Sequence, residues 1–356
     1  RPRAIGKVNT AYKLSIMAWD LNTIWFVIVG ILFTGYAILD GFDLGVGILH
    51  LLTKTDEERR LMLNAIGPVW DGNEVWLVTG GGALFAAFPE AYATVFSAFY
   101  YPFILLLAAL IFRAVSIELR SKSQIPELRK FWDVAFSAGS FLSAFLIGVA
   151  MGNIIWGIPL DDHFEYTGEF LYMLHPYALL CGVLVVSMFM LHGAMYIVLK
   201  TEGDLQAKAR QWAEKAAVFF VGIYFIFNIM TVLNVPDVRT ALAHRPHMWW
   251  IFVLDLVALA LMLVHLNRRH DRRAFVYSCI TMALMMALFG VTMYPDMVFS
   301  FPLSDNSLTI YNAASSAKTL EIMLIIACIG VPLVLTYTIS IYWIFRGKVR
   351  ITPESY

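Results

Sequence analysis

The sequence predicts an all-α integral membrane protein with about nine transmembrane helices. Hydrophobic residues make up 60% of the 356 residues and charged residues only 15%, whereas soluble domains are about 25% charged. The mean hydropathy is +0.70, and the apolar residues form runs of about 18 or more. A soluble monomer could not bury so much apolar surface, which excludes most soluble enzymes, disordered proteins and fibrous proteins.

The first three predicted spans cover about 21–51, 62–88 and 92–117. Pro68 is expected to bend the start of the second span. Phe88-Pro89-Glu90 supplies a break before the third, although 74–117 could also form one bent helix. Met17-Ala18-Trp19-Asp20 resembles a natural start, so we expect residues 1–16 to be an extension outside the fold.

The other six predicted spans cover about 132–157, 169–199, 213–234, 248–266, 273–295 and 318–345. Spans longer than the roughly 20 residues needed to cross the bilayer should tilt or protrude. The prediction is therefore a single transmembrane domain over 17–346, followed by a cytoplasmic tail at 347–356.

The basic residues predict the orientation, although the net charge of zero suggests no asymmetry. The loops of one predicted face carry Lys54, Arg59, Arg60, Arg120, Lys122, Arg129, Lys130, Lys200, Lys208, Arg210, Lys215, Arg268, Arg269, Arg272, Arg273, Arg346, Lys348 and Arg350. Beyond the N-terminal segment, the other face carries only Arg239, Arg245 and Lys318. The positive-inside rule places the first face in the cytoplasm, the N-terminus outside and the C-terminus inside.

Several classes of binding site find no support in the sequence. The balanced charge argues against a nucleic-acid surface, and no GxGxxG or P-loop motif is present. Cys181, Cys279 and Cys328 are too dispersed for a zinc, iron–sulfur or disulfide pattern. The eight histidines form no evident intramembrane pair, so we expect no haem ligand and no metal site of this chain's own.

A few charged residues fall inside the apolar spans and are the candidate functional residues. Asp40 and Asp43 share one face of the first span, Asp71 and Glu74 share one face of the second, and Arg113 lies in the third. At 1.5 Å per residue, Asp43, Asp71 and Arg113 lie ~14, ~15 and ~10 Å from the predicted cytoplasmic side. They could therefore meet, with Arg113 as the charge partner.

Two interpretations of these charges remain open. Buried carboxylates line proton routes in membrane proteins, which favours a proton relay entered from the cytoplasm. A satisfied salt-bridge cluster that locks three helices would use the same residues. Asp255 and Glu321 also lie in or near apolar stretches. Gly41 and Gly45 are spaced for close helix packing.

Two stretches together closely resemble subunit II of cytochrome bd-type quinol oxidases. They are Asp40-Gly-Phe-Asp-Leu-Gly-Val-Gly47 and Gly67-Pro-Val-Trp-Asp-Gly-Asn-Glu-Val-Trp76. The glycine-rich continuation at 80–89, Phe112-Arg113 and Gly152-Asn153 are also similar. The resemblance extends over about residues 18–346.

The resemblance implies two four-helix bundles, about 21–157 and 169–295, and a peripheral helix at about 318–345. It implies an obligate partner, subunit I, which carries the b and d haems. The complex oxidises quinol, reduces dioxygen to water and generates a proton gradient without pumping, in the bacterial inner membrane. Some members of the family hold a structural quinone in this subunit, and a small single-helix subunit is a further expected partner, beside membrane lipid.

The resemblance also assigns roles to single residues. Proton-path acids of the family correspond to Asp43 and Asp71, with Asp40 as a neighbour; Glu74 stands where some relatives have an amide. Trp76 matches a tryptophan on a proposed oxygen route. The alternatives are a proton-coupled secondary transporter, for which no inverted repeat is seen, and a chain that only supports subunit I.

Overall fold

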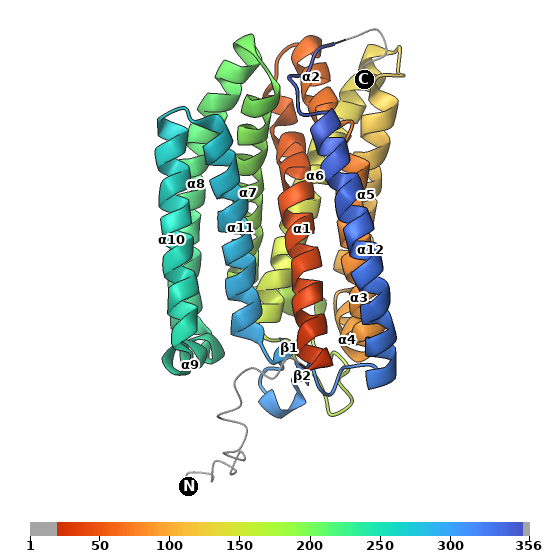
Figure 1. The fold of residues 1–356 in the computed structure, drawn as a ribbon, viewed down its shortest axis with the longest axis vertical. Coiled ribbons are helices and arrows are strands. Elements are labelled where there is room, and N and C mark those ends of the chain that lie inside the picture. The colour runs from red at the N-terminus through yellow and green to blue at the C-terminus, as the bar shows by residue number, and fades with distance from the viewer. Residues whose placement is uncertain (1–19, 352–356) are drawn as a thin grey trace.

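The computed structural model describes residues 20–351 and shows a bundle of long, roughly parallel helices (Figure 1). The helices are α1 (Leu21–Leu49), α2 (Asp56–Ile66), α3 (Trp70–Ala87), α4 (Pro89–Ala98), α5 (Tyr100–Arg120), α6 (Pro126–Trp156), α7 (Pro176–Lys200), α8 (Gly203–Asn234), α9 (Pro236–His244), α10 (Pro246–Asn267), α11 (Asp271–Met293) and α12 (Ala317–Ile344). The predicted extension at 1–16 and the last five residues of the predicted tail lie outside the described part.

Eight of the helices within residues 20–351 are long and apolar enough to cross a membrane: α1, α5, α6, α7, α8, α10, α11 and α12. The prediction of an all-α membrane fold is confirmed. The remaining predicted span, 62–88, corresponds to α3, which has 18 residues, packs against α1 and is not among these eight. The count of nine and the division into two bundles stay predictions.

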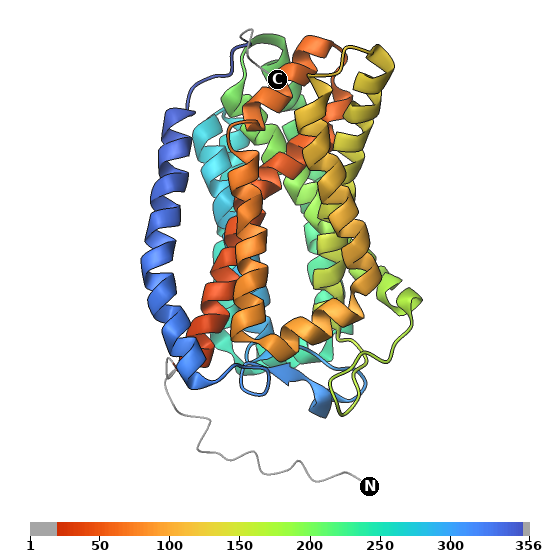
Figure 2. The ribbon, with the colours of Figure 1, turned by 90° about the vertical axis from the view of Figure 1, so that its right-hand side faces the viewer.

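The breaks between the first helices differ in part from the predicted boundaries. The predicted span 62–88 begins inside α2 and is interrupted around Pro68, so that α3 starts only at Trp70. The predicted break at Phe88-Pro89 is confirmed, but a second break falls at Phe99, inside the predicted span 92–117. Pro102 explains this second break. Proline is tolerated only in the first turn of a helix, and in one continuous helix its ring would clash with the preceding turn. α4 therefore lies across the bundle between α3 and α5 (Figure 2).

One end of the bundle carries most of the basic residues, in its loops and in the helix turns next to them, and we call this end the basic end. Its loops are residues 50–56, 120–126, 200–203, 267–271 and 345–351. The opposite end holds a short antiparallel ladder of β1 (Asp296–Val298) and β2 (Leu308–Thr309), which the all-α prediction does not include. Short 3₁₀ turns cover His50–Leu52, Phe170–Leu174 and Ser304–Asn306.

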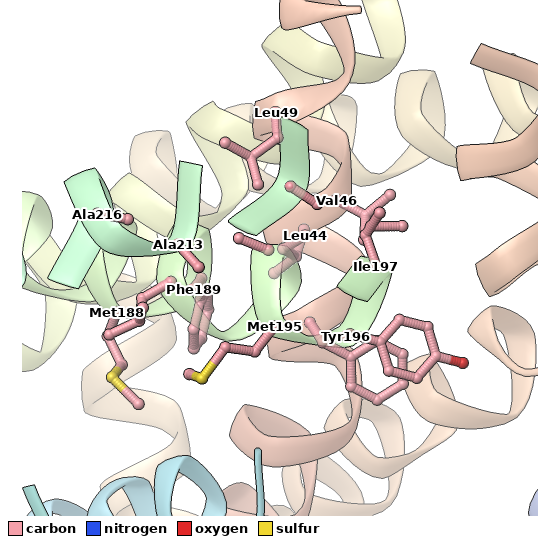
Figure 3. Packing of buried hydrophobic residues seen from close by; sticks show 14 of the residues in the cluster. Leu44, Val46, Leu49, Met188, Phe189, Met195, Tyr196, Ile197, Ala213 and Ala216 are labelled. Atoms are coloured by element: carbon pink, nitrogen blue, oxygen red, sulfur yellow. The ribbon is translucent and has the colours of Figure 1, made fainter. Parts of the chain in front are cut away.

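The main core lies where α1, α7 and α8 pack together (Figure 3). Its side chains include Leu44 of α1, Phe189 and Met195 of α7 and Ala213 of α8, all of them buried. α12 packs on α1 and α3 at the edge of the bundle, and Leu320 is its only buried residue. α1 thus occupies the centre, which is why polar residues on it become buried.

Candidate functional site

Asp40 and Asp43 lie one turn apart on α1, and both are fully buried. The glycines around them let α7 approach the α1 backbone closely. A Cβ at Gly45 would lie 1.8 Å from the carbonyl oxygen of Phe189, and one at Gly41 would lie 2.8 Å from the Phe189 ring. The prediction that Gly41 and Gly45 serve close packing is confirmed.

Arg113 of α5 forms a bidentate ion pair with Asp40 of α1. Its Nη1 and Nη2 donate to the two carboxylate oxygens at 3.0 and 2.5 Å, and neither side chain is exposed. Glu74 of α3 lies 3.8 Å from Arg113 Nη1, with 21% of its side chain exposed. The bidentate geometry offsets part of the cost of removing both charges from water. The structure thus brings Asp40, Glu74 and Arg113 together from three helices.

Asp43 is held by a different partner, which the sequence analysis missed. Asn73 of α3 donates from Nδ2 to Asp43 Oδ2 at 2.7 Å and to the Leu39 carbonyl at 3.1 Å. The Tyr342 hydroxyl of α12 donates to Asn73 Oδ1 at 2.8 Å. Asp43 Oδ1 is buried without a hydrogen-bond partner within the described chain. A hydrogen-bonded chain therefore runs from α12 through α3 to α1 and ends on a carboxylate with one free oxygen.

Asp71, which was expected at a similar depth to Asp43 and Arg113, does not join this group within the described chain. The side chain is exposed on α3. The buried residues Trp70, Asn73 and Trp76 lie three residues apart and form the inward face of α3. Asp71 follows Trp70 directly, so its side chain is rotated by about 100° from that of Trp70. The sequence itself indicates this inward face, because Asn73 lies three residues from both Trp70 and Trp76 and residues at that spacing share one face of a helix.

Trp76 packs tightly against the middle of α1. A Cβ at Gly35 would lie 2.3 Å from Trp76 Cε3, so the indole occupies the space that a larger residue would fill. Its neighbours Leu32 and Tyr36 form a small buried cluster with it. The indole therefore forms an apolar wall about half a turn along α3 from Glu74.

A second buried ionic cluster lies toward the basic end and was also missed. Asp133 of α6 accepts hydrogen bonds at 2.6 Å each from Arg59 Nη1 of α2 and Arg120 Nε of α5. His50 Nε2 lies 2.6 Å from Asp133 Oδ1, and Arg120 also pairs with Asp56 at 2.7 Å. Asp133 lies at the edge of its predicted span, where charged residues are common. Nothing in the sequence therefore indicates that it is buried.

The remaining intramembrane acids have simpler surroundings. Asp255 of α10 is buried and accepts a hydrogen bond from the Tyr224 hydroxyl of α8 at 2.7 Å. Glu321 is exposed on α12. Neither lies in the group around Arg113 as far as residues 20–351 show.

Two of the histidines with described side chains are buried, and both make hydrogen bonds. His192 of α7 is buried, with Nδ1 2.7 Å from Ser278 Oγ and Nε2 3.1 Å from the Ile38 carbonyl. His50, the other buried histidine of the described side chains, is engaged with Asp133. Residues 20–351 contain no group of three or more His, Cys, Asp or Glu side chains that could hold a metal ion.

The sequence matches the profile of a known family over residues 21–345, namely cytochrome bd terminal oxidase subunit II. It is 39% identical to cytochrome bd-I ubiquinol oxidase subunit 2 of Escherichia coli strain K12, over 94% of this chain and 96% of the relative. It is 36% identical to the probable cytochrome oxidase subunit 2 of Haemophilus influenzae, over 92% and 95%. Identity to cytochrome bd ubiquinol oxidase subunit 2 of Bacillus subtilis is 35%, over 93% and 97%.

The fold also matches a solved structure, that of the bd oxidase from Geobacillus thermodenitrificans. The TM-score is 0.75, and the match covers 92% of this chain and 98% of the matched chain, at 16% sequence identity. At this identity the likeness is one of fold.

Proposed function

The chain belongs to the family of cytochrome bd terminal oxidase subunit II, and from this premise we propose that it conducts protons toward the oxidase site of its complex. It is a multi-pass subunit of a membrane oxidoreductase and acts with a haem-bearing subunit I. The haems of the partner would supply electron transfer from quinol and reduction of dioxygen to water. The side chains of this chain would hold and pass the protons that the reduction consumes.

The observation that carries this proposal is the buried polar chain of α1. Asp43 has one carboxylate oxygen bonded to Asn73 and one without a hydrogen-bond partner within the described chain. A carboxylate held in this way can take up a proton on its free oxygen while its position stays constant. Asp40 lies one turn away and is paired with Arg113. We assign Asp43 to proton transfer and Asp40 to the charge balance beside it.

The exposed position of Asp71 supports a role at the contact with subunit I. A carboxylate on the outer face of a membrane helix is costly in hydrocarbon and is expected to face protein or water. We propose that Asp71 faces the partner subunit and that Glu74, half-buried between Asp71 and Arg113, connects the two sides. Trp76 would line an apolar route for dioxygen beside this polar one.

The basic end supports the direction of the route. Its loops and the helix turns next to them carry most of the lysines and arginines, so we place this end in the cytoplasm, the N-terminus outside and the C-terminus inside. Protons would then enter from the cytoplasm, and their consumption would build a gradient without pumping. Bound structural quinone and a small third subunit are further proposals, which follow from the family resemblance.

Two other interpretations use the same residues. The transporter hypothesis loses its support because the chain belongs to an oxidase family. The scaffold hypothesis is favoured by a specific observation, the solvent-free Asp40–Arg113 pair, which locks α1 to α5. Under it, Asp43 and Asp71 would contribute to assembly only.

The experiment compares Asp43→Asn and Asp71→Asn in the assembled complex with the control Asp255→Asn. All three changes keep the side-chain shape, and Asp255 is a buried carboxylate outside the chain of Asp43. We expect quinol oxidase turnover to fall about tenfold or more in the first two variants, since a proton-transfer group contributes about 10²–10⁴-fold, with haem content unchanged.

Normal turnover in both variants would refute the proton route. Loss of haem and of assembly, with normal turnover per remaining haem, would support the scaffold hypothesis instead. For the dioxygen route, the variant is Trp76→Ala, and an unchanged oxygen affinity and rate would argue against it.

A further inference from the structure

A cavity of about 760 Å³ opens at the basic end, where α7 ends, α11 begins and α12 ends. Five cationic side chains line it: Lys200, Arg272, Arg273, Arg346 and Lys348. The one acid in its lining, Asp271, is already paired with Arg210 through two hydrogen bonds of 2.6 Å each. The cavity therefore carries a net positive charge that the described chain does not neutralise.

The cations differ in how they are held. Lys348 donates to the carbonyls of Val198 and Thr201 at 3.2 and 2.8 Å, and Lys200 donates to the carbonyl of Phe345. These bonds tie the end of α12 to the end of α7 and keep both ammonium groups beside the cavity. Arg272 and Arg273 are exposed, in the first turn of α11.

The start of α11 adds to the positive potential. Its N-cap residue, His270, makes no side-chain hydrogen bond to the first turn. Helix N-termini attract anions because their first N–H groups are unpaired and the helix dipole is positive there. Since Asp271 and Arg272 of this turn line the cavity, the helix dipole favours an anion there, in addition to the cationic side chains.

The cavity is also apolar, which a site for a free inorganic anion would not need. Leu199, Phe275 and Phe345 line it beside the cations. A second cavity of about 330 Å³ shares Arg272 and Arg273 and continues along α11 over Val276, Tyr277 and Ile280. Val276 and Ile280 are 54% and 40% exposed on this membrane-spanning helix. The two cavities together present cations at the helix end and an apolar strip directed into the membrane.

We propose that these two cavities form a binding site for an anionic phospholipid. The phosphate group lies between Arg272, Arg273 and the start of α11, and one acyl chain follows the strip of Val276 and Ile280. Basic pockets between transmembrane helices are suited to anionic headgroups. The apolar strip selects a lipid over a free phosphate ion. The larger cavity also touches Tyr342, which donates to Asn73 of the chain that reaches Asp43. The proposed phosphate and acyl-chain contacts, at Arg272, Arg273, Val276 and Ile280, use no residue of that chain.

The test is native mass spectrometry of the delipidated oxidase complex, titrated with phosphatidylglycerol, phosphatidylcholine or inorganic phosphate. The variant is Arg272→Gln/Arg273→Gln, and the matched control is Arg268→Gln/Arg269→Gln, which removes the same charge from the preceding loop outside the cavities. Each basic residue near an anionic headgroup contributes about a factor of five. We expect phosphatidylglycerol to bind the variant about thirtyfold more weakly and to bind the control as it binds the parent.

A third variant guards against a general loss of structure. Arg272→Lys/Arg273→Lys keeps the charge, and we expect it to bind phosphatidylglycerol within a few-fold of the parent. Phosphatidylcholine should bind the parent about as weakly as phosphatidylglycerol binds the glutamine variant. Equal losses in the glutamine variant and its control would overturn the proposal, as would an unchanged glutamine variant. Displacement of the lipid by millimolar inorganic phosphate would assign the site to a free anion and would also overturn it.

Discussion

Arg113 of α5 donates to both carboxylate oxygens of Asp40 of α1, and neither side chain is exposed. The pair connects the most central helix of the bundle to a neighbour 73 residues further along the chain. Replacing the arginine would leave Asp40 as a buried charge without its counterion, which costs far more than the pair gains.

We therefore expect Arg113→Met to lower the stability of the assembled complex by about 3–5 kcal/mol. The measurement is thermal unfolding of the purified complex, together with its yield. In the double variant Arg113→Met/Asp40→Leu, the loss should be smaller than the sum of the two single losses, because no unpaired charge remains. Additive losses would contradict an interaction between the two side chains.

The second prediction concerns the bridge between α3 and α1. Asn73→Leu removes the donor to Asp43 and the acceptor of Tyr342 at once, so we expect a stability loss of about 1–3 kcal/mol from the unsatisfied carboxylate. Turnover should fall with it if Asp43 carries protons. Tyr342→Phe removes only one bond and should cost about 1 kcal/mol. Tyr337→Phe, at an exposed position of the same helix, is the control and should change neither quantity.

The third prediction uses the closest backbone approach between α1 and α7. In Gly45→Ala, the new Cβ would meet the Phe189 carbonyl at 1.8 Å. Backbone cannot move aside as a flexible side chain can, so we expect about 3 kcal/mol or more of destabilisation and a clear loss of assembled complex. Gly30→Ala on the same helix meets nothing within 4 Å and should be neutral or stabilising by up to about 1 kcal/mol. Equal behaviour of the two variants would count against this packing.

The fourth prediction is a pH dependence at α2. Burial raises the pKa of Glu58, but the hydrogen bonds from Lys208 and from the Lys54 backbone N–H lower it, and the net pKa lies below the ordinary value. A carboxyl with a lowered folded pKa stabilises the fold above its unfolded pKa of about 4.3 and loses this contribution as the pH falls through the folded value.

Accordingly, Glu58→Gln should lower the unfolding temperature at pH 7, by the equivalent of about 1 kcal/mol or less because Lys208 is partly exposed. The difference from the parent should shrink as the pH falls below about 4. Glu57→Gln, an exposed neighbour in the same turn, should show no such pH-dependent difference. A gap between Glu58→Gln and the parent that stays constant down to pH 3 would contradict the assigned pairing.

The predicted boundaries were most accurate where periodic apolar runs met charged loops. The predicted span 248–266 corresponds to α10 (Pro246–Asn267), and the predicted span 318–345 corresponds to α12 (Ala317–Ile344). They were least accurate between residues 56 and 120, where Pro68, Pro89 and Pro102 divide the chain into four helices. Proline marks a probable break, but neighbouring helices decide which break actually forms.

The sequence by itself determined that this chain crosses a membrane many times, which end carries the basic loops, and that few charges remain in the apolar interior. These properties depend on composition and order along the chain, because hydrocarbon excludes charge wherever the chain crosses it. Only the tertiary structure decided the partners: Arg113 with Asp40, Asn73 with Asp43 and Tyr342, and Asp71 directed outward. Pairing depends on how each helix is rotated about its own axis, and packing against neighbouring helices sets that rotation.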